Sequence, residues 1–458
     1  MLGDGVANRG PFSGWRRMNS FMRMRMNTGK RLVTILFVSS LPVLSVMTIR
    51  TTAITAQVQL KPTANPIPSA FFGMHIHHMV SGAPQPTPWP AIPFGSWRFW
   101  DAYAAWPNLE PEKGKWNFQF TDKYVDAAEA HHVQVLFPIA LSPAWASARP
   151  QEKSAYSPGN AAEPKDINDW RNYVRTVATR YKGRVHAYEI WNEPNLKGFY
   201  SGSTAQLVQL ASVAYQTLKE IDQENIICSP AFTGASGLPL FDQYLQAGGG
   251  KYADVIGYHL YVNPAPPEDM VPLTQQVEAV MSKHGVRNKQ LWDTETGWAI
   301  QNTQSEVKPA PGKGFNSVVL SLDQASAYVA RTYILAWAMD VSRLYWYSWD
   351  NKIMGLTEED GKTLKPPAHA YAEVEKWLVG ARMNSCASDA SWTWTSEISR
   401  DGGYHGWLVW NPNQSLSFKI PPTWNPKLVR DLKGAQREIP PKGNIEIGPS
   451  PILLETGQ

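Results

Sequence analysis

The stretch Val185-His-Ala-Tyr-Glu-Ile-Trp-Asn-Glu-Pro-Asn195 predicts a short buried strand with a carboxylate at its tip. Aromatic and β-branched residues from Tyr188 to Trp191 favour the strand. Pro194 ends it because proline cannot donate to a strand ladder. Glu193 is therefore presented at the C-terminal end of the strand, where (β/α)8 barrels place their chemistry.

A second stretch, Gln290-Leu-Trp-Asp-Thr-Glu-Thr-Gly-Trp298, has the same layout. Apolar residues lead to Glu295, and Gly297 then interrupts the strand. Glu295 follows Glu193 by 102 residues. Three βα units of roughly 30 to 40 residues each fill that interval, so the two stretches are predicted to be barrel strands four and seven.

The two motifs in this order, Trp191-Asn-Glu-Pro194 and Thr294-Glu-Thr-Gly297, resemble the retaining glycoside hydrolases of clan A. Within the clan, the chain looks most like glycoside hydrolase family 39 and its exopolysaccharide-cleaving endoglycosidases. The resemblance implies that Glu193 is the acid/base and Glu295 the nucleophile, and that Asn192 donates to the sugar 2-hydroxyl. An isolated Asn-Glu-Pro would be read as a turn with a surface carboxylate, but two such strand ends at barrel spacing favour a catalytic pair.

Three further side chains match supporting positions of the clan. Arg98, in the predicted second strand, matches an arginine that supports the nucleophile, with an ordinary ion pair as the alternative. His259 and Tyr261 resemble the clan's His-x-Tyr beside the nucleophile, and strand alternation places both on one side. The alternative for His259 is a histidine satisfied within the core.

No metal or other cofactor is expected. His75, His77 and His78 are close in sequence at the end of the predicted first strand, but they lack partners at ligand spacing. A substrate-side role for His77 is therefore favoured. The only cysteines, Cys228 and Cys386, fall in different predicted domains, so one disulfide is possible but not implied.

Tryptophan is abundant, with 20 residues in the chain, and several stand where predicted strands end. Indole rings stack on the apolar faces of pyranose sugars, so this distribution fits a carbohydrate cleft, although some of the rings must belong to the core. The tryptophans at predicted strand mouths are Trp97, Trp100, Trp145, Trp298, Trp346 and Trp349, and the last four are the candidates for sugar contact.

The predicted fold is an α/β (β/α)8 TIM barrel over residues 69–380, followed by a small antiparallel β-sandwich domain over residues 381–458. The alternating residues Gln57 to Leu60 predict a strand, and residues 57–68 are expected to join it to the β-domain as strand and linker. The predicted barrel strands are residues 71–77, 97–101, 133–140, 185–191, 226–229, 255–261, 290–295 and 343–350. Helices are predicted over residues 120–130, 164–181, 322–340 and 366–379 and after a capping box at Ser203 to Gln206.

Residues 1–56 have the layout of an export signal or a membrane anchor, with a basic region before the apolar run 32–49. They hold eight Lys or Arg against one Asp, so the rest of the chain carries a formal charge of −3 although the total is +4. A basic surface for nucleic acid is thus not supported. We expect an extracytoplasmic protein that is secreted, periplasmic or attached to a membrane through residues 32–49.

The sequence therefore predicts a retaining glycoside hydrolase that cleaves β-linked bonds in a polysaccharide or oligosaccharide with two glutamates. A transglycosylase would use the same residues with a sugar as acceptor. A carbohydrate-binding barrel without catalysis would keep the aromatic residues and lose a carboxylate, and both carboxylates are present here.

Overall fold

The structure is a computed structural model that describes residues 58–79, 86–309, 316–441 and 443–457, and residues 57–458 form one compact unit. The predicted export signal or anchor at residues 1–56 lies outside the described residues. Within the described ranges, no helix combines the length and apolarity needed to span a membrane.

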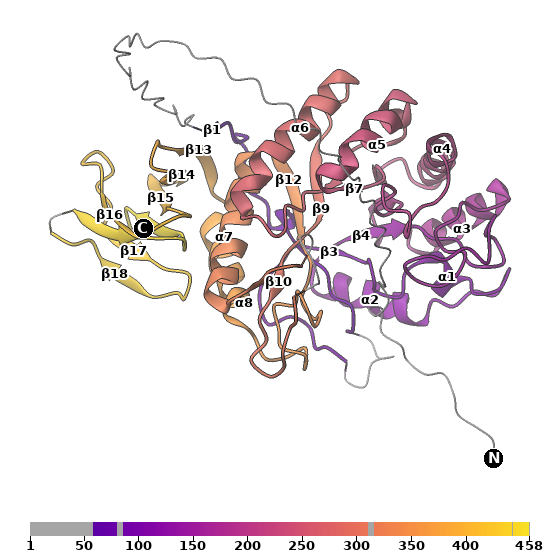
Figure 1. Ribbon diagram of the computed structural model, residues 1–458, viewed down its shortest axis with the longest axis horizontal. Coiled ribbons are helices and arrows are strands. Elements are labelled where there is room, and N and C mark those ends of the chain that lie inside the picture. The colour runs from indigo at the N-terminus through magenta and orange to yellow at the C-terminus, as the bar shows by residue number, and fades with distance from the viewer. Residues whose placement is uncertain (1–57, 80–85, 310–315, 442, 458) are drawn as a thin grey trace, which may run out of the picture. The chain divides into compact units, whose positions relative to one another are not determined.

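Parallel strands form a closed (β/α)8 barrel (Figure 1). The sheet runs in the order β6-β5-β4-β3-β2-β12-β9-β8-β7. Parallel bridges join Cys228 to Val255 and Asn192 to Ala231, so β6 and β7 are two halves of one barrel position and the sheet closes on itself. The strands are β2 (Phe72–Met74), β3 (Ser96–Arg98), β4 (Gln134–Ile139), β5 (Ala187–Ile190), β6 (Ile226–Cys228), β7 (Phe232–Thr233), β8 (Ile256–His259), β9 (Leu291–Thr296) and β12 (Val341–Trp346).

Helices surround these strands. They are α1 (Trp106–Leu109), α2 (Gln119–Ala130), α3 (Ile167–Arg180), α4 (Thr204–Ile221), α5 (Gly234–Gln246), α6 (Met270–Lys283), α7 (Leu322–Ala338) and α8 (Pro366–Leu378), with 3-10 turns η1 (Ser69–Phe71), η2 (Gly249–Tyr252) and η3 (Pro267–Asp269). The predicted capping box at Ser203 and Gln206 is present and begins α4. The sequence did not specify α5 and α6. Pro239 lies inside α5 and Pro272 in the first turn of α6, and a proline weakens the helical pattern.

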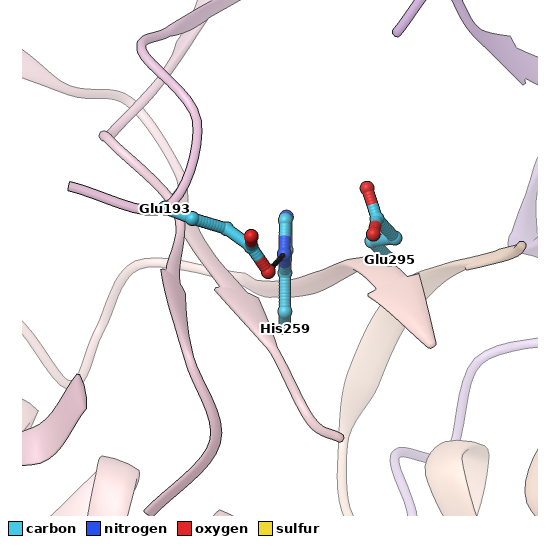
Figure 2. A group of neighbouring side chains, drawn as sticks. All are labelled: Glu193, His259 and Glu295. Carbon is cyan, nitrogen blue, oxygen red and sulfur yellow. Dashed lines mark hydrogen bonds and ion pairs between the residues drawn. The ribbon is translucent and has the colours of Figure 1, made fainter. Parts of the chain in front are cut away.

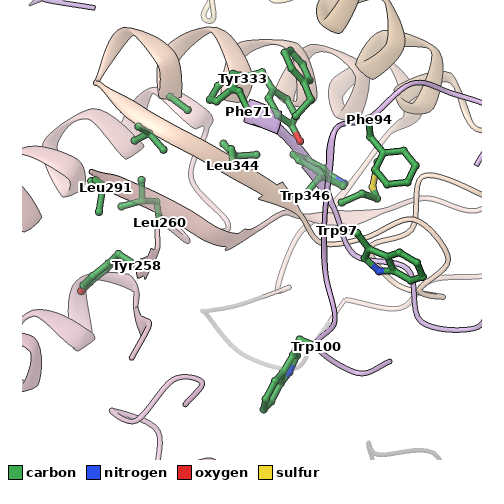
Figure 3. Packing of buried hydrophobic residues seen from close by; sticks show 14 of the residues in the cluster. Phe71, Phe94, Trp97, Trp100, Tyr258, Leu260, Leu291, Tyr333, Leu344 and Trp346 are labelled. Atoms are coloured by element: carbon green, nitrogen blue, oxygen red, sulfur yellow. The ribbon is translucent and has the colours of Figure 1, made fainter. Parts of the chain in front are cut away.

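Aromatic residues pack among the aliphatic residues of the core between strands and helices (Figure 3). Phe72 of β2 stacks on Tyr333 of α7 with ring centroids 4.5 Å apart. A second group inside the barrel, with Trp292 and Tyr345 among its members, fills the space between the strands. Both packings hold the strands rigidly, so side chains at the strand ends are positioned precisely.

The C-terminal residues form antiparallel sheets. One has seven strands in the order β1-β13-β14-β15-β20-β17-β18, and β16 pairs with β19 in a second. Trp407, Ile445 and Leu454 belong to an apolar cluster that both sheets share. The bounds are β1 (Gln59–Leu60), β13 (Arg382–Ser388), β14 (Trp394–Arg400), β15 (Tyr404–Trp410), β16 (Leu416–Lys419), β17 (Leu428–Arg430), β18 (Gln436–Glu438), β19 (Asn444–Ile447) and β20 (Ile452–Glu455).

The strand β1 lies far from this domain in sequence but at the edge of its sheet. Gln59 pairs with Ala387 and Leu60 with Cys386 in an antiparallel register. Cys386 and Cys228 are both buried and do not form a disulfide. A further pair of two-residue strands, β10 (Ala299–Ile300) and β11 (Val319–Leu320), flanks the loop after β9.

A buried ion pair connects the barrel to the C-terminal sheet. Arg331 of α7 donates to Glu268 of η3 at 3.2 Å, and the indole of Trp410 in β15 donates to the same carboxylate oxygen at 2.9 Å. Arg331 and Glu268 are 1% and 7% exposed, so each charge depends on the other for stabilisation.

We expect Glu268→Ala to lower the free energy of unfolding by about 3–5 kcal/mol, because it leaves the Arg331 charge buried without a partner. Trp410→Phe, which removes one hydrogen bond and keeps an aromatic ring, should cost about 1–2 kcal/mol. Urea unfolding followed by tryptophan fluorescence measures both. A loss below about 1 kcal/mol for Glu268→Ala would contradict a buried and uncompensated arginine.

Candidate active site

The two predicted glutamates meet at the C-terminal ends of the barrel strands (Figure 2). Glu193 follows β5, Glu295 lies in β9, and His259 ends β8. One carboxylate oxygen from each glutamate and one ring nitrogen of His259 all lie within 4.8 Å of one another. Each glutamate is 8% exposed, so both are desolvated and still reachable from the mouth of the barrel.

Backbone strain aims Glu193 into the mouth. Trp191 and Glu193 both adopt left-handed conformations, with φ of 64° and 45°. Such conformations cost about 1–3 kcal/mol each in non-glycine residues and persist only where the surroundings enforce them. Here the Glu193 amide donates to Ala231 O at 2.8 Å, and the indole of Trp191 donates to Phe199 O at 2.9 Å. The sharp turn that the proline signalled is thus fixed from both sides.

Two donors hold the carboxylate of Glu295. Arg98 Nη1 donates at 2.9 Å to Oε2, and the Tyr261 hydroxyl donates at 3.0 Å to Oε1. The remaining guanidinium nitrogens of Arg98 donate to Glu189 and, at 2.7 Å, to Asn192 Oδ1. Arg98 therefore joins β3 to β5 and β9 through charge-assisted hydrogen bonds.

Asn192 is oriented by this network. Its side-chain oxygen accepts from Arg98, so its amide NH2 is the group left to donate elsewhere. Glu189, the counter-ion of Arg98, was missed by the sequence reasoning. Its signal is a carboxylate in the middle of an apolar strand, because a buried charge needs a partner.

A neutral imidazole contacts the other glutamate. His259 Nδ1 lies 3.0 Å from Glu193 Oε1. Burial lowers the pKa of His259 to about 4, so the ring is uncharged near neutral pH. The contact with Glu193 is then a hydrogen bond whose direction follows the imidazole tautomer, and it brings no positive charge to the carboxyl.

Burial is the main cause of the raised pKa of both glutamates. It raises the pKa of Glu193 to about 7, against a hydrogen bond with Thr233 and the charge of Arg98. It also raises the pKa of Glu295 to about 7, against the charge of Arg98, since His259 is uncharged near neutral pH. The direct contacts distinguish the pair, because Glu295 alone receives a guanidinium and a phenol donor. Those donors favour the ionised form of Glu295 and leave the shared proton on Glu193.

His77 lies to one side of the pair. The amides of His77 and His78 donate to Asp350, which follows β12, at 2.9 and 2.8 Å. Burial lowers the pKa of His77, and its ring lies 5.0 Å from that of Tyr347. The structure therefore places His77 at the barrel mouth without direct contact to either glutamate.

The prediction that tryptophans at strand ends stack on sugar needs correction. Trp298, Trp346 and Trp349 are at most 2% exposed, and Trp298 stacks on Trp346 at 5.8 Å. These rings fill the core because side chains near a strand end point to the helices as well as to the mouth. Trp145 is partly exposed and donates to Glu110 O at 2.9 Å.

Glu193, His259 and Glu295 could in principle offer ligands to a metal ion. However, Arg98 and Tyr261 already donate to both oxygens of Glu295. A cation placed beside the Arg98 guanidinium would also be repelled. The arrangement fits proton transfer better than metal coordination.

Comparison with known proteins agrees with this geometry. The family model described as glycosyl hydrolases family 39 matches residues 100–334, just over half of the chain. The chain belongs to glycosyl hydrolases family 39. The family prediction is thereby confirmed.

Curated relatives of this family 39 chain include two proteins named β-xylosidase. The one from Geobacillus stearothermophilus is 24% identical over 241 residues, which cover 47% of this chain and 47% of that protein. The one from Caldicellulosiruptor saccharolyticus is 29% identical over 134 residues, which cover 27% and 26% of the two chains. The alignments thus span about half or less of these relatives.

Solved structures share the fold. A family 39 glycoside hydrolase from Bacteroides cellulosilyticus WH2 has a TM-score of 0.65 at 19% identity and covers 85% of this chain and 81% of its own. A monomeric β-xylosidase from Caulobacter crescentus CB15 has a TM-score of 0.59 at 16% identity, covering 87% and 99%. These similarities support the barrel described above.

The raised pKa of Glu193 makes stability depend on pH. Since its folded-state pKa of about 7 exceeds the ordinary value of 4.5, its contribution to stability is fully present below 4.5 and is lost as pH rises through 7. Glu193→Gln does not titrate, so we expect its unfolding free energy relative to wild type to rise by about 1–3 kcal/mol between pH 4.5 and 8. Urea titrations at the two pH values measure this difference.

The matched control is Glu112→Gln, because Glu112 has a side chain that is 68% exposed and lies far along the chain from the site. Its stability relative to wild type should change little over the same range. A Glu193→Gln difference that does not vary with pH would contradict the desolvated carboxyl.

Proposed function

We propose that this family 39 protein is a retaining glycosidase that cleaves β-linked glycosidic bonds by double displacement. The observation that carries the proposal is the close approach of Glu193 and Glu295, within 4.8 Å, in unequal surroundings. Retaining enzymes place their carboxyl groups about 5–5.5 Å apart, whereas inverting enzymes need about 6.5–9.5 Å to admit a water.

In the first step, Glu295 attacks the anomeric carbon while Glu193 donates its proton to the leaving oxygen. Arg98 and Tyr261 support this division, because they stabilise the negative charge on Glu295 before the sugar arrives. The burial of Glu193 keeps its proton available near neutral pH, because this burial outweighs the opposing charge of Arg98.

In the second step, Glu193 acts as a base toward water. Formation of the glycosyl ester removes the negative charge of Glu295 close to Glu193, which lowers the pKa of Glu193 and favours its ionised form. The neutral His259 accommodates both states, since its Nδ1 donates in one tautomer and accepts in the other.

Asn192 is proposed to bind the sugar in the cleaved bond. Arg98 fixes its oxygen, so the amide NH2 is turned away from the guanidinium and is available to a sugar hydroxyl. A donor to the 2-hydroxyl strengthens as the ring approaches the oxocarbenium-like transition state. His77 and Trp145 are proposed to border the cleft.

The proposal extends to the rest of the chain. The relatives named β-xylosidase make β-xylosides the first substrates to test, and a polysaccharide remains the proposed natural substrate.

The C-terminal sheets, with their shared apolar cluster, are proposed to form a β-sandwich that belongs to the catalytic unit. Residues 1–56 are proposed to direct the protein out of the cytoplasm.

The direct test is a screen of aryl β-glycosides and β-linked polysaccharides for released sugar, followed by NMR of the first product. We expect hydrolysis with the β-anomer formed first, because two displacements restore the starting configuration. Glu295→Gln is the inactive control. An α-anomer as first product, or equal activity in Glu295→Gln, would contradict the proposal.

Removing each glutamate should give different defects. Glu193→Ala should slow cleavage of an alkyl glycoside by about 10²- to 10⁴-fold, whereas an activated aryl glycoside needs little acid assistance. With the aryl substrate, azide should restore turnover of Glu193→Ala and give the β-glycosyl azide. Glu295→Ala should be inactive on both substrates, and azide should give the α-glycosyl azide.

The stereochemistry of the two azide products is read by NMR. An α-azide from Glu193→Ala together with a β-azide from Glu295→Ala would reverse the assigned roles. Wild type with azide serves as the control for uncatalysed azidolysis.

A further inference from the structure

A cavity of about 260 Å³ lies between the loops that follow β3 and β4. Its lining begins directly after Arg98, the residue that binds Glu295. The lining includes Trp100, Asp101, Tyr103, Asn108, Tyr156 and Ser157. Pockets for drug-sized ligands begin at about 300 Å³, so this volume suits a single sugar ring.

Asp101 stands at the rim with its carboxylate held in place. The hydroxyl of Tyr156 donates at 2.5 Å to one oxygen, and that of Tyr347 donates at 3.0 Å to the other. Asp101 also has a left-handed backbone, with φ of 60°, and it is exposed. Residues from the loops after β3, β4 and β12 thus fix one carboxylate in a set position.

Among the described residues, no lysine or arginine neutralises the charge of Asp101, which acts instead on the nearby imidazoles of His77 and His78 and favours the protonated form of each. In the part of the chain that the structure describes, no Lys or Arg forms an ion pair with Asp101, and none lines the cavity. Arg98, the nearest guanidinium along the chain, is engaged by Glu189, Glu295 and Asn192. The carboxylate therefore offers a negative charge to whatever enters.

Aromatic rings form the walls of the cavity. Trp100 and Tyr156 meet edge to face with centroids 5.9 Å apart; Trp100 is 5% exposed and Tyr156 is 42% exposed, so the Tyr156 ring offers the larger accessible face. Ring faces of this kind stack on pyranose rings and attract cations. Aromatic walls with one carboxylate combine the two features that a positively charged sugar needs.

The cavity adjoins the reaction centre. The guanidinium carbon of Arg98 lies 5.6 Å from the Trp100 ring centroid. Tyr347, which binds Asp101, has its ring 5.1 Å from that of His75, and His75 in turn contacts Thr294 O, next to Glu295. The lining of the cavity is thus connected to the reaction centre through Arg98 on one side and through Tyr347 and His75 on the other.

We propose that this cavity is a sugar subsite that favours a unit carrying a free ammonium group, as in a deacetylated hexosamine, over neutral units, and that it disfavours uronic acids. The proposal rests on the proposed function for its place beside the cleaved bond. A subsite that used Asp101 only to accept hydrogen bonds from hydroxyls would instead show no preference between cationic and neutral sugars.

The test is equilibrium binding, which needs no turnover. The probes are methyl 1-thio-β-glycosides of glucosamine, glucose and glucuronic acid, which share a ring and differ in charge, and NMR titration gives their dissociation constants. Wild type should bind the glucosaminide about fivefold more tightly than the glucoside, as expected for one partly exposed charge pair, and the glucuronide most weakly. Raising the pH until the amine is neutral should remove the preference.

Asp101→Asn should bring the three dissociation constants within about twofold of one another, while Asp101→Glu should keep their order. The matched control is Asp401→Asn, which removes a carboxylate that is 94% exposed in the C-terminal sheet and should change nothing. Equal binding of glucosaminide and glucoside by wild type, absence of binding, or a preference that survives in Asp101→Asn would overturn the proposal. Hydrolysis of neutral glycosides is measured separately, so failure of this subsite leaves the proposed function standing.

Discussion

The buried guanidinium of Arg98 is the constraint on which the site depends. It is inaccessible to solvent and bonds to Glu189, Asn192 and Glu295, which come from two different strand ends. Removing one partner of a buried charge pair typically costs about 3–5 kcal/mol, so the barrel is stable only when these groups are together. The same bonds that close the top of the barrel therefore hold the proposed nucleophile and orient the proposed sugar contact.

This arrangement also separates the two glutamates chemically. Both are desolvated to a similar extent, so burial alone would leave either one protonated. The difference lies in the donors, because Arg98 and Tyr261 reach Glu295 while Glu193 meets an uncharged His259. The left-handed turn at Glu193 separates its carboxyl from the guanidinium of Arg98. It also holds that carboxyl close enough to Glu295 for both groups to act on one glycosidic bond.

Local patterns predicted the barrel strands, and the resemblance to the clan singled out Glu193, Glu295 and Arg98, which the structure brings together. Two strand ends that each carry a glutamate, at barrel spacing, favoured a catalytic pair where one alone would not, and the α4 capping box is a short-range signal with one geometry. Boundaries were less accurate. The eighth strand was expected over residues 343–350, but β12 runs from Val341 to Trp346. After it, the Tyr347 hydroxyl donates to Asp101, in the loop that follows β3.

Contacts between distant loops were not predictable from the sequence. Asp101, Tyr156 and Tyr347 come together only in the folded barrel, and no periodicity marks them. The burial of Trp298 and Trp346 likewise depends on how α7 and β12 pack. A local pattern cannot tell a ring at the mouth from one behind the strand, because the two differ by a rotation of the side chain.

The central claim is that Arg98 and Tyr261 keep Glu295 ionised while Glu193 holds the proton. A pH titration of protein labelled with carboxyl-¹³C glutamate, followed by NMR and assigned with Glu193→Gln and Glu295→Gln, reads each carboxyl directly. The account predicts that the Glu295 resonance reports ionisation at a lower pH than that of Glu193. Ionisation of Glu193 first, with Glu295 still protonated, would contradict it.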